Sequence, residues 1–212
     1  MKVLILDGHP DCDRLTTVLL SRYAEALPEH VEHKRIAVRD LRFDPTFLGR
    51  PAGEPPLEPD LQRLWAAMAD CDHLVLGFPL WWGAEPGPLK GLFDRMLQPD
   101  YAFRYRDGGR SWDRLLAGRT ADVLITMDTP PLILGLLFAD PIGRRLRRQV
   151  LGFCGFHPLR IYSFEPVHGG GAERNITAWS RVVARAARSC EALRRVEKVT
   201  SPQLAALVAT GA

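Results

Sequence analysis

The sequence predicts an α/β fold in which a five-stranded parallel sheet carries helices on both faces. Two observations lead to this prediction. Short apolar segments alternate along the chain with longer segments whose apolar residues recur at helical spacing. No repeat with a period of about 20 to 50 residues is present. The resulting βαβαβαβαβα order favours a doubly wound sheet with the strand order 2-1-3-4-5.

The strands are expected where apolar and β-branched residues cluster, at 3–6, 31–38, 73–78, 121–127 and 160–164. The first of these is a continuous apolar run, which is typical of a central parallel strand buried on both faces. The alternating residues at 101–105, followed by turn residues at 107–109, predict a short hairpin outside this series.

The helices are expected at 15–27, 61–70 and 88–97, and from the glycines at 169–171 to about 196. The region 132–156 is expected to be helical in its second half. Prolines at 45, 51, 55, 56 and 59, together with the lack of periodicity, mark 41–59 as a surface connection. We therefore expect a single domain over 1–197, followed by a C-terminal tail over 198–212.

Composition and charge exclude several classes of function. The 212-residue chain has a formal net charge of +3, and its acidic residues are interspersed among the basic ones, so nucleic acid is not an expected partner. The longest apolar run, 132–139, is far shorter than the ~20 residues of a membrane-spanning helix. The first strand begins without a signal peptide before it, which predicts a cytoplasmic protein.

The cysteines at 12, 71, 154 and 190 form no CxxC pair, and each lies in or beside an apolar segment. This pattern predicts four buried, unreactive thiols in a reducing compartment. No metal site is expected, because His9, Asp11 and His168 lack the spacing of metal ligands.

Two adjacent tryptophans, Trp81 and Trp82, lie in the loop between the third strand and its helix. This loop is at the carboxyl edge of the sheet, where planar ligands bind in open α/β folds. Adjacent residues of an extended segment point to opposite sides. We therefore expect one tryptophan to lie in the core and the other to flank a flat ring. In the order 2-1-3-4-5, this loop and the loop after Asp7 face one crevice, so they are expected to share a ligand.

The loop after the first strand has neither a G-x-G-x-x-G dinucleotide fingerprint nor a P-loop. It does lead into a helix, whose first N–H groups can hold a phosphate. Thr16 and Thr17 add hydroxyl donors, and His9 and Arg14 add positive charge. In the alternative interpretation Asp13 caps an ordinary helix. A phosphate at this loop and a ring at the tryptophan loop together indicate a flavin nucleotide.

Residues 78–83, Phe-Pro-Leu-Trp-Trp-Gly, and 89–95, Leu-Lys-Gly-Leu-Phe-Asp-Arg, match the patterns F-P-L-x-W and L-K-G-x-x-[DE]-R. With these motifs, residues 2–196 resemble the flavodoxin-like NAD(P)H:quinone oxidoreductase family, which includes the DT-diaphorase-type enzymes and related bacterial NAD(P)H oxidoreductases. The resemblance implies a flavodoxin-like fold, a bound flavin (FMN or FAD) and a homodimer in which the partner subunit completes each pocket.

The resemblance also implies which residues bind the flavin. The ring would lie along Pro79, Leu80, Trp81, Trp82 and Gly83, the phosphate loop would start at His9, and a third loop would contribute Met127, Asp128 and Thr129. Two departures stand out. Arg14, Leu15 and Thr16 replace the family's Ser-Phe-Asn, so the phosphate contacts of Arg14, Leu15, Thr16 and Thr17 must differ. Pro130 and Pro131 lack N–H donors. No catalytic residue is carried over from the family.

The implied reaction is hydride transfer from NAD(P)H to the flavin and onward to a quinone or a similar small-molecule acceptor. Backbone donors near Gly83 and Thr129 would stabilise the reduced flavin, and the Asp128 carboxylate is expected to face elsewhere. The alternative function is a flavin-binding regulatory subunit of a membrane ion-efflux system, which would make contact through 132–139 and the arginines of 144–148. These segments have simpler interpretations as a dimer interface or pocket lid and as a solvated helix face. A one-electron flavodoxin carrier is disfavoured, because such carriers are strongly acidic.

Overall fold

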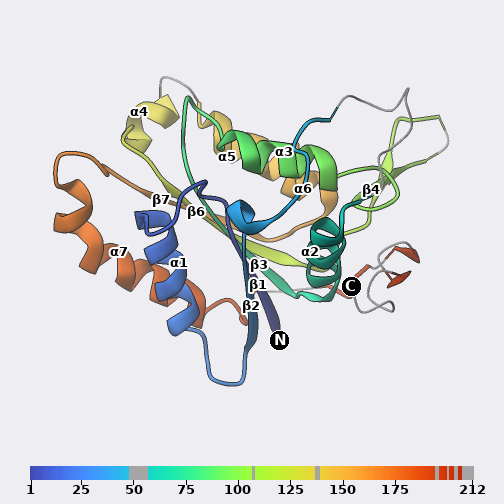
Figure 1. The fold of residues 1–212 in the computed structure, drawn as a ribbon, viewed down its shortest axis with the longest axis horizontal. Coiled ribbons are helices and arrows are strands. Elements are labelled where there is room, and N and C mark those ends of the chain that lie inside the picture. Colours follow the sequence, from blue (N-terminus) through green and yellow to red (C-terminus); the bar gives the residue numbers. More distant parts are fainter. Residues whose placement is uncertain are drawn as a thin grey trace.

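A five-stranded parallel sheet with the order β2-β1-β3-β6-β7 forms the centre of the molecule (Figure 1). The computed structural model describes residues 1–47, 57–106, 108–136, 139–193, 196–199, 201–202 and 205–206. The strands are β1 (Lys2–Asp7), β2 (Glu32–Ala37), β3 (His73–Pro79), β6 (Thr120–Thr126) and β7 (Leu159–Phe164). All five predicted strands are present, and the observed ends of each strand differ from the predicted ends by no more than one residue.

The predicted order 2-1-3-4-5 and the observed order are the same arrangement of the parallel strands. The labels differ because a two-stranded antiparallel hairpin, β4 (Phe103–Tyr105) and β5 (Trp112–Arg114), precedes the fourth parallel strand along the chain. The predicted hairpin is therefore confirmed, although Asp107 in its turn lies outside the described residues.

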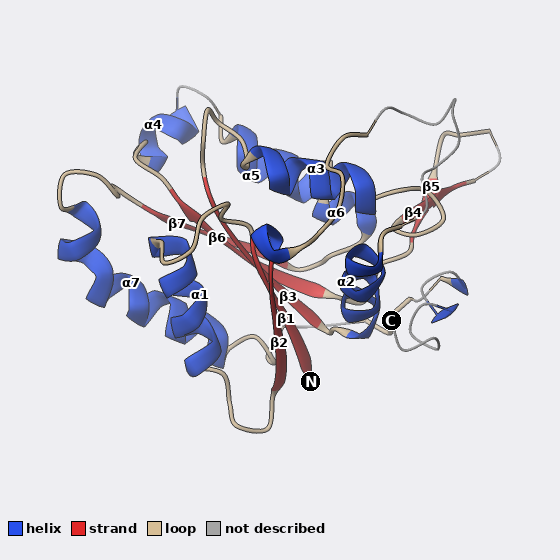
Figure 2. Cartoon of the chain, viewed as in Figure 1, coloured by secondary structure: helices blue, strands red, loops and turns tan. Residues whose placement is uncertain are grey.

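Helices cover both faces of the sheet, as predicted (Figure 2). One face carries α1 (Leu15–Glu25) and α7 (Gly171–Arg188), and the other carries α2 (Pro59–Asp70), α3 (Gly87–Met96), α5 (Pro141–Arg148) and α6 (Leu151–Cys154). Each layer buries its own apolar cluster, since neighbouring residues of a strand point to opposite faces. Leu4 and Leu6 pack toward the α2 side, and Val3 and Ile5 toward the α1 side.

Two helical predictions were wrong in their limits. The region 132–156 is helical in its first half as well, because α4 (Pro131–Leu136) precedes α5 and α6. The last helix ends at Arg188 instead of near 196. Its apolar face is complete at Ala187, and the N–H of Ser189 turns back to the carbonyls of Arg185 and Ala186.

The connection predicted at 41–59 follows a short 3-10 turn, η1 (Val38–Asp40). It has no helix or strand at 41–47 and 57–58, its residues 48–56 lie outside the described residues, and its last residue, Pro59, is already the first residue of α2. In the described part of the chain, no helix combines the length and apolarity that a membrane span requires. The division into a domain over 1–197 and a tail over 198–212 stays a prediction.

Candidate flavin site at the carboxyl edge of the sheet

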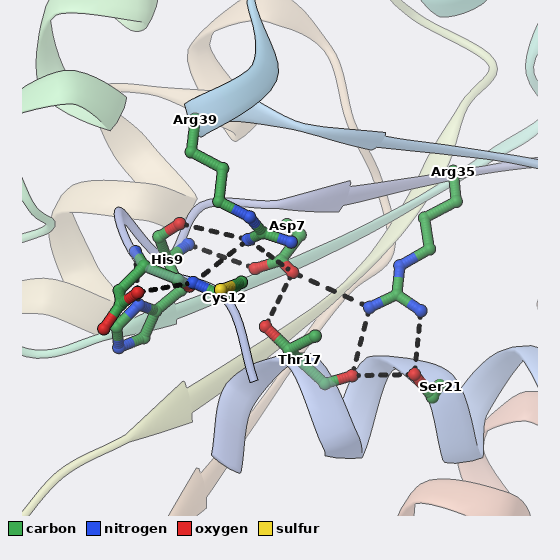
Figure 3. A network of polar contacts seen from close by, with 8 residues as sticks. Asp7, His9, Cys12, Thr17, Ser21, Arg35 and Arg39 are labelled. Carbon is green, nitrogen blue, oxygen red and sulfur yellow. Dashed lines mark hydrogen bonds and ion pairs between the residues drawn. The ribbon is translucent and has the colours of Figure 1, made fainter. Parts of the chain in front are cut away.

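The loop after β1 is organised around the carboxylate of Asp7, which is completely buried (Figure 3). Its oxygens accept hydrogen bonds from the His9 N–H at 3.1 Å, the Thr17 hydroxyl at 2.8 Å and the Arg39 guanidinium at 3.0 Å. The guanidinium of Arg35 lies 3.6 Å away. A buried carboxylate requires such partners, because an unpaired charge in the interior is costly. This network holds the loop, α1 and the end of β2 together.

His9 is buried in the same loop, and its Nδ1 accepts the Asp11 N–H at 2.9 Å. Burial lowers the pKa of His9. A neutral imidazole whose Nδ1 accepts a hydrogen bond carries its proton on Nε2. His9 therefore offers one Nε2–H donor instead of the positive charge expected from the sequence.

The phosphate-binding side chains expected from the sequence are largely engaged within the protein. Arg14 lies at the surface and pairs with Asp11. The hydroxyl of Thr17 donates to Asp7, and that of Thr16 is paired with Thr126 at 2.8 Å. Apart from the Nε2–H of His9, the available donors at this end of the site are thus backbone groups.

The start of α1 supplies such backbone donors. Its first residue, Leu15, follows an N-cap residue with no capping side-chain hydrogen bond. Within the described residues, the N–H groups of Leu15, Thr16 and Thr17 have no acceptor. Unpaired N–H groups at a helix start attract anions.

Trp81 and Trp82 lie in a tight turn after β3. The N–H and carbonyl of Trp81 bond to those of Ala84, at 2.9 and 3.0 Å. Trp82 and Gly83, between them, have φ angles of 53° and 79°. The prediction that one tryptophan lies in the core was wrong: Trp81 is 47% exposed and Trp82 is fully exposed. The rule for extended segments does not apply, because residues 81–84 form a turn.

This turn leaves an aromatic surface and backbone donors at one place. Within the described residues, the N–H groups of Trp82 and Gly83 have no acceptor. The preceding residues fix the base of the turn, since Pro79 ends β3 and the N–H of Leu80 donates to the carbonyl of Thr126 at 2.8 Å. Donors of this kind can bond to the polar edge of a heterocycle.

The first loop and the tryptophan turn are in contact, as the predicted topology requires. The N–H of Gly8 donates to the carbonyl of Gly77 at 2.7 Å. The ring of His9 meets the ring of Trp81 edge to face, with centroids 5.9 Å apart. The structure therefore brings these two predicted site segments together at one edge of the sheet.

The third predicted segment follows β6, the strand next to β3. Met127 is buried, and Thr129 is partly exposed. The carboxylate of Asp128 accepts from the N–H groups of Val167 and His168, at 3.0 and 2.7 Å, and from the His168 ring. These bonds lower the pKa of Asp128. Its carboxylate is thus engaged with the loop after β7.

The ion pair between Glu85 and Arg145 joins the tryptophan turn to α5. Glu85 follows the turn directly, its side chain is completely buried, and both of its oxygens bond to the guanidinium. This hydrogen bonding raises the pKa of Arg145. The run 144–148 is therefore not simply a solvated helix face, because one of its arginines is directed into the molecule.

Some residues of this region are outside the sequence-based site. Asp7, a charged residue at the end of an apolar strand, is a detectable signal, whereas nothing in the local sequence marks Arg39 or Glu85. Three of the cysteines are buried as predicted, but Cys12 is exposed, because it lies in the stretch 11–14 of the first loop, which is exposed throughout. Burial raises the pKa of Cys71 and Cys154 to about 12.

A family model described as a flavodoxin-like fold matches residues 1–188. Among curated proteins, the chain is 29% identical over 174 residues to an FMN-dependent NADH:quinone oxidoreductase of Azotobacter vinelandii, a match that covers 74% of this chain and 81% of that protein. Five other curated relatives are matched over 52% to 60% of their own length.

Solved structures share the fold at lower sequence identity. The NAD(P)H:quinone oxidoreductase of Methanothermobacter marburgensis superposes with a TM-score of 0.73 at 23% identity, covering 90% of this chain and 97% of that one. An FMN-dependent NADH-azoreductase of Bacillus anthracis, solved in complex with FMN, superposes with a TM-score of 0.63 at 14% identity, covering 88% and 99%.

Proposed function

Because the chain belongs to the flavodoxin-like fold family, we propose that it is a flavin-dependent oxidoreductase that passes a hydride from NAD(P)H to bound flavin and then to a quinone or a similar small acceptor. The observation that carries this proposal is the turn at Trp82 and Gly83, which presents an exposed aromatic ring and unpaired N–H groups beside the loop of His9. The names of the Azotobacter and Methanothermobacter relatives agree with it.

The flavin, when bound, supplies the hydride chemistry, and the protein orients it. Trp82 would provide a face for the ring, and the N–H groups of Trp82 and Gly83 would hold its polar edge. The unpaired N–H groups at the start of α1 and the Nε2–H of His9 would hold the phosphate. These assignments keep Pro79, Leu80, Trp81, Met127 and Thr129 as predicted lining residues.

Fixed backbone donors are well suited to the charge of a reduced flavin, because they need no reorganisation during the reaction. The Asp128 carboxylate would not oppose that charge, since it is bonded to Val167 and His168. The predicted role of Arg14 as a phosphate ligand would require it to leave Asp11.

FMN is the proposed form of the cofactor, because the names of the Azotobacter relative and of the azoreductase specify FMN.

The relatives named above are all described as reductases or oxidoreductases, and none of those names describes a regulatory subunit of an ion-efflux system. A cytoplasmic location is part of the proposal and rests on the sequence.

The absorbance spectrum of the purified protein tests the proposal directly. We expect the visible absorbance bands of an oxidised flavin. We also expect the cofactor released from the protein to have the mass of FMN. Anaerobic addition of NADH or NADPH to the flavin-loaded protein is expected to bleach these bands, and a quinone is expected to restore them. A protein that binds no flavin, or whose flavin is bleached by neither nucleotide, would refute the proposal.

A further inference from the structure

The anionic end of the proposed flavin would lie beside a buried carboxylate of the protein itself. Asp7 ends β1 and is completely buried beneath the first loop. A phosphate held at the start of α1 would therefore approach a negative charge that water does not screen. Some feature of the chain must offset this repulsion if the site binds a phosphate.

Two arginines from the β2 end of the sheet provide the compensating charge (Figure 3). Arg39, in η1, bonds to Oδ2 of Asp7 at 3.0 Å, and its side chain is only 19% exposed. Arg35, in β2, lies 3.6 Å from the same oxygen and also donates to the Thr17 carbonyl at 3.1 Å. One carboxylate with two guanidinium groups gives a net positive cluster at the base of the loop.

Arg39 also shapes the loop itself. The Nη1 atom that bonds to Asp7 lies 3.3 Å from the His9 carbonyl and 3.4 Å from the Asp11 carbonyl. Both oxygens are the negative ends of peptide dipoles, and their direction toward Arg39 keeps them turned away from an anion. Among the described residues, Arg35 makes no hydrogen bond to a carbonyl of this loop, although it approaches the Asp7 carboxylate. Its backbone partner is on α1, so the two arginines have different roles.

On these grounds we infer that Arg39 is a positioning residue of the phosphate subsite: it neutralises Asp7 and holds loop 7–11 so that only donors face the phosphate. This inference rests on the proposed function. Arg39 would thereby help to build the phosphate subsite without contacting the phosphate. The family's Ser-Phe-Asn side chains are replaced in this chain by Arg14, Leu15 and Thr16.

A comparison of FMN with riboflavin isolates the phosphate, because the two ligands share the ring and the ribityl chain. Dissociation constants for both would be measured on flavin-free protein by flavin fluorescence. For Arg39→Met we expect FMN to bind at least about tenfold more weakly, which corresponds to ~1.4 kcal/mol. Riboflavin should bind within about twofold of the unsubstituted protein. An equal loss for both flavins, or no loss for FMN, would overturn the inference.

Variants of Asp7 test the charge argument and do not depend on the stability of Arg39→Met. We expect Asp7→Asn to raise the affinity ratio of FMN to riboflavin by at least about twofold. We expect the double variant Asp7→Asn/Arg39→Met to recover most of the FMN affinity lost in Arg39→Met. Arg39→Lys, which keeps the charge, should fall between Arg39→Met and the unsubstituted protein. An unchanged ratio in Asp7→Asn would contradict the inference.

Arg104→Met is the matched control, since Arg104 of β4 forms an exposed ion pair with Asp100 and its loss changes the net charge by the same amount. We expect it to leave both flavin affinities unchanged, and an equal effect of this control would overturn the inference. Unsubstituted protein that binds neither flavin would refute the proposed function itself. Binding of both flavins with no effect of Arg39 would refute this inference alone.

Discussion

Trp82 combines two unfavourable features in one residue. Its side chain is fully exposed, and its φ of 53° lies in the left-handed region that bulky side chains avoid. That conformation costs ~1 to 2 kcal/mol for a residue with a Cβ. Strain of this kind is found where a binding site requires it. The chain would be more stable with glycine here, and this cost supports the ring-binding role proposed for Trp82.

We expect Trp82→Gly to lower FMN affinity at least about tenfold while leaving the free energy of unfolding of the flavin-free protein unchanged or up to ~1 kcal/mol higher. Fluorescence titration and urea unfolding measure the two quantities. Trp65→Gly is the contrasting control, because Trp65 is completely buried and its loss should be strongly destabilising. If Trp82→Gly kept its FMN affinity but had a lower free energy of unfolding, Trp82 would serve packing and not flavin binding.

At the scale of elements, a buried polar cluster joins four of them at the other end of the sheet. Asp122 in β6 accepts from the Tyr23 hydroxyl of α1 at 2.8 Å and from Arg160 of β7 at 2.6 and 2.5 Å. His73 of β3 lies 3.4 Å away. Each partner satisfies a group that would be costly to bury alone. The cluster therefore holds α1 to the sheet, and with it the helix start that the site uses.

Asp122→Asn removes the charge opposite Arg160 and is expected to lower the free energy of unfolding by about 3 kcal/mol, because it leaves a partly buried guanidinium without its counter-ion. Urea unfolding at neutral pH measures this. Asp94→Asn, which breaks the exposed pair with Lys90, should cost no more than about 0.5 kcal/mol. Equal effects of the two substitutions would show that the cluster adds no stability beyond a surface pair.

The same cluster predicts acid sensitivity. Burial by itself raises the pKa of Asp122, but the hydrogen bonds of His73 and Arg160 outweigh it and leave the pKa below its ordinary 3.8. The folded state thus binds this proton less tightly than the unfolded state. Its contribution is complete above about pH 4 and is lost as the pH falls through the folded-state value. Unfolding free energies should fall more steeply below about pH 4 in the unsubstituted protein than in Asp122→Asn. Parallel pH curves would exclude this.

The Glu85–Arg145 pair anchors α5 to the end of the tryptophan turn. Arg145→Met leaves a completely buried carboxylate unpaired, so we expect a loss of about 3 kcal/mol in the free energy of unfolding. The double variant Glu85→Met/Arg145→Met should return to within ~1 kcal/mol of the unsubstituted protein, since an apolar pair can replace a buried ion pair. Urea unfolding of both variants measures this, and a double variant as unstable as the single one would contradict it.

At the scale of the whole molecule, α4 leaves apolar side chains uncovered. Leu132 and Leu136 are 70% and 76% exposed, on the helix that follows the third site segment. Exposed apolar clusters of this kind mark interaction surfaces. They support the homodimer that the resemblance implies, with the partner subunit covering the edge of the sheet that carries the site.

Light scattering tests this prediction. We expect the unsubstituted protein to have the mass of a dimer, and Leu132→Glu/Leu136→Glu to have the mass of a monomer, because two buried carboxylates would face an apolar partner. Val182→Glu/Val196→Glu also places two charges at exposed valines, outside α4, and should remain dimeric. A monomeric unsubstituted protein, or a dimer that survives the α4 substitutions, would remove α4 from the interface.

The sequence by itself determined the sheet and the segments that make up the candidate site. The strand positions follow from local apolar runs, and the strand order follows from the alternation of strands and helices, so neither needs a contact between distant residues. The segment 78–83, which is proposed to line the flavin ring, was recognisable for the same reason, since it is one continuous stretch of sequence. Helix limits were less predictable, because the end of α7 at Arg188 depends on a turn that the periodicity does not encode.

Only the tertiary structure decided which side chains face the site. Asp7 meets Arg39 across 32 positions of sequence, and Glu85 meets Arg145 across 60. Such pairs form only after packing has brought their elements together, so no local pattern announces them. For the same reason, the sequence could not show that Thr17 serves Asp7 instead of a phosphate, or that a turn places both tryptophans at the surface. Local chemistry indicated the candidate site, and long-range packing determined which of its donors are left unpaired.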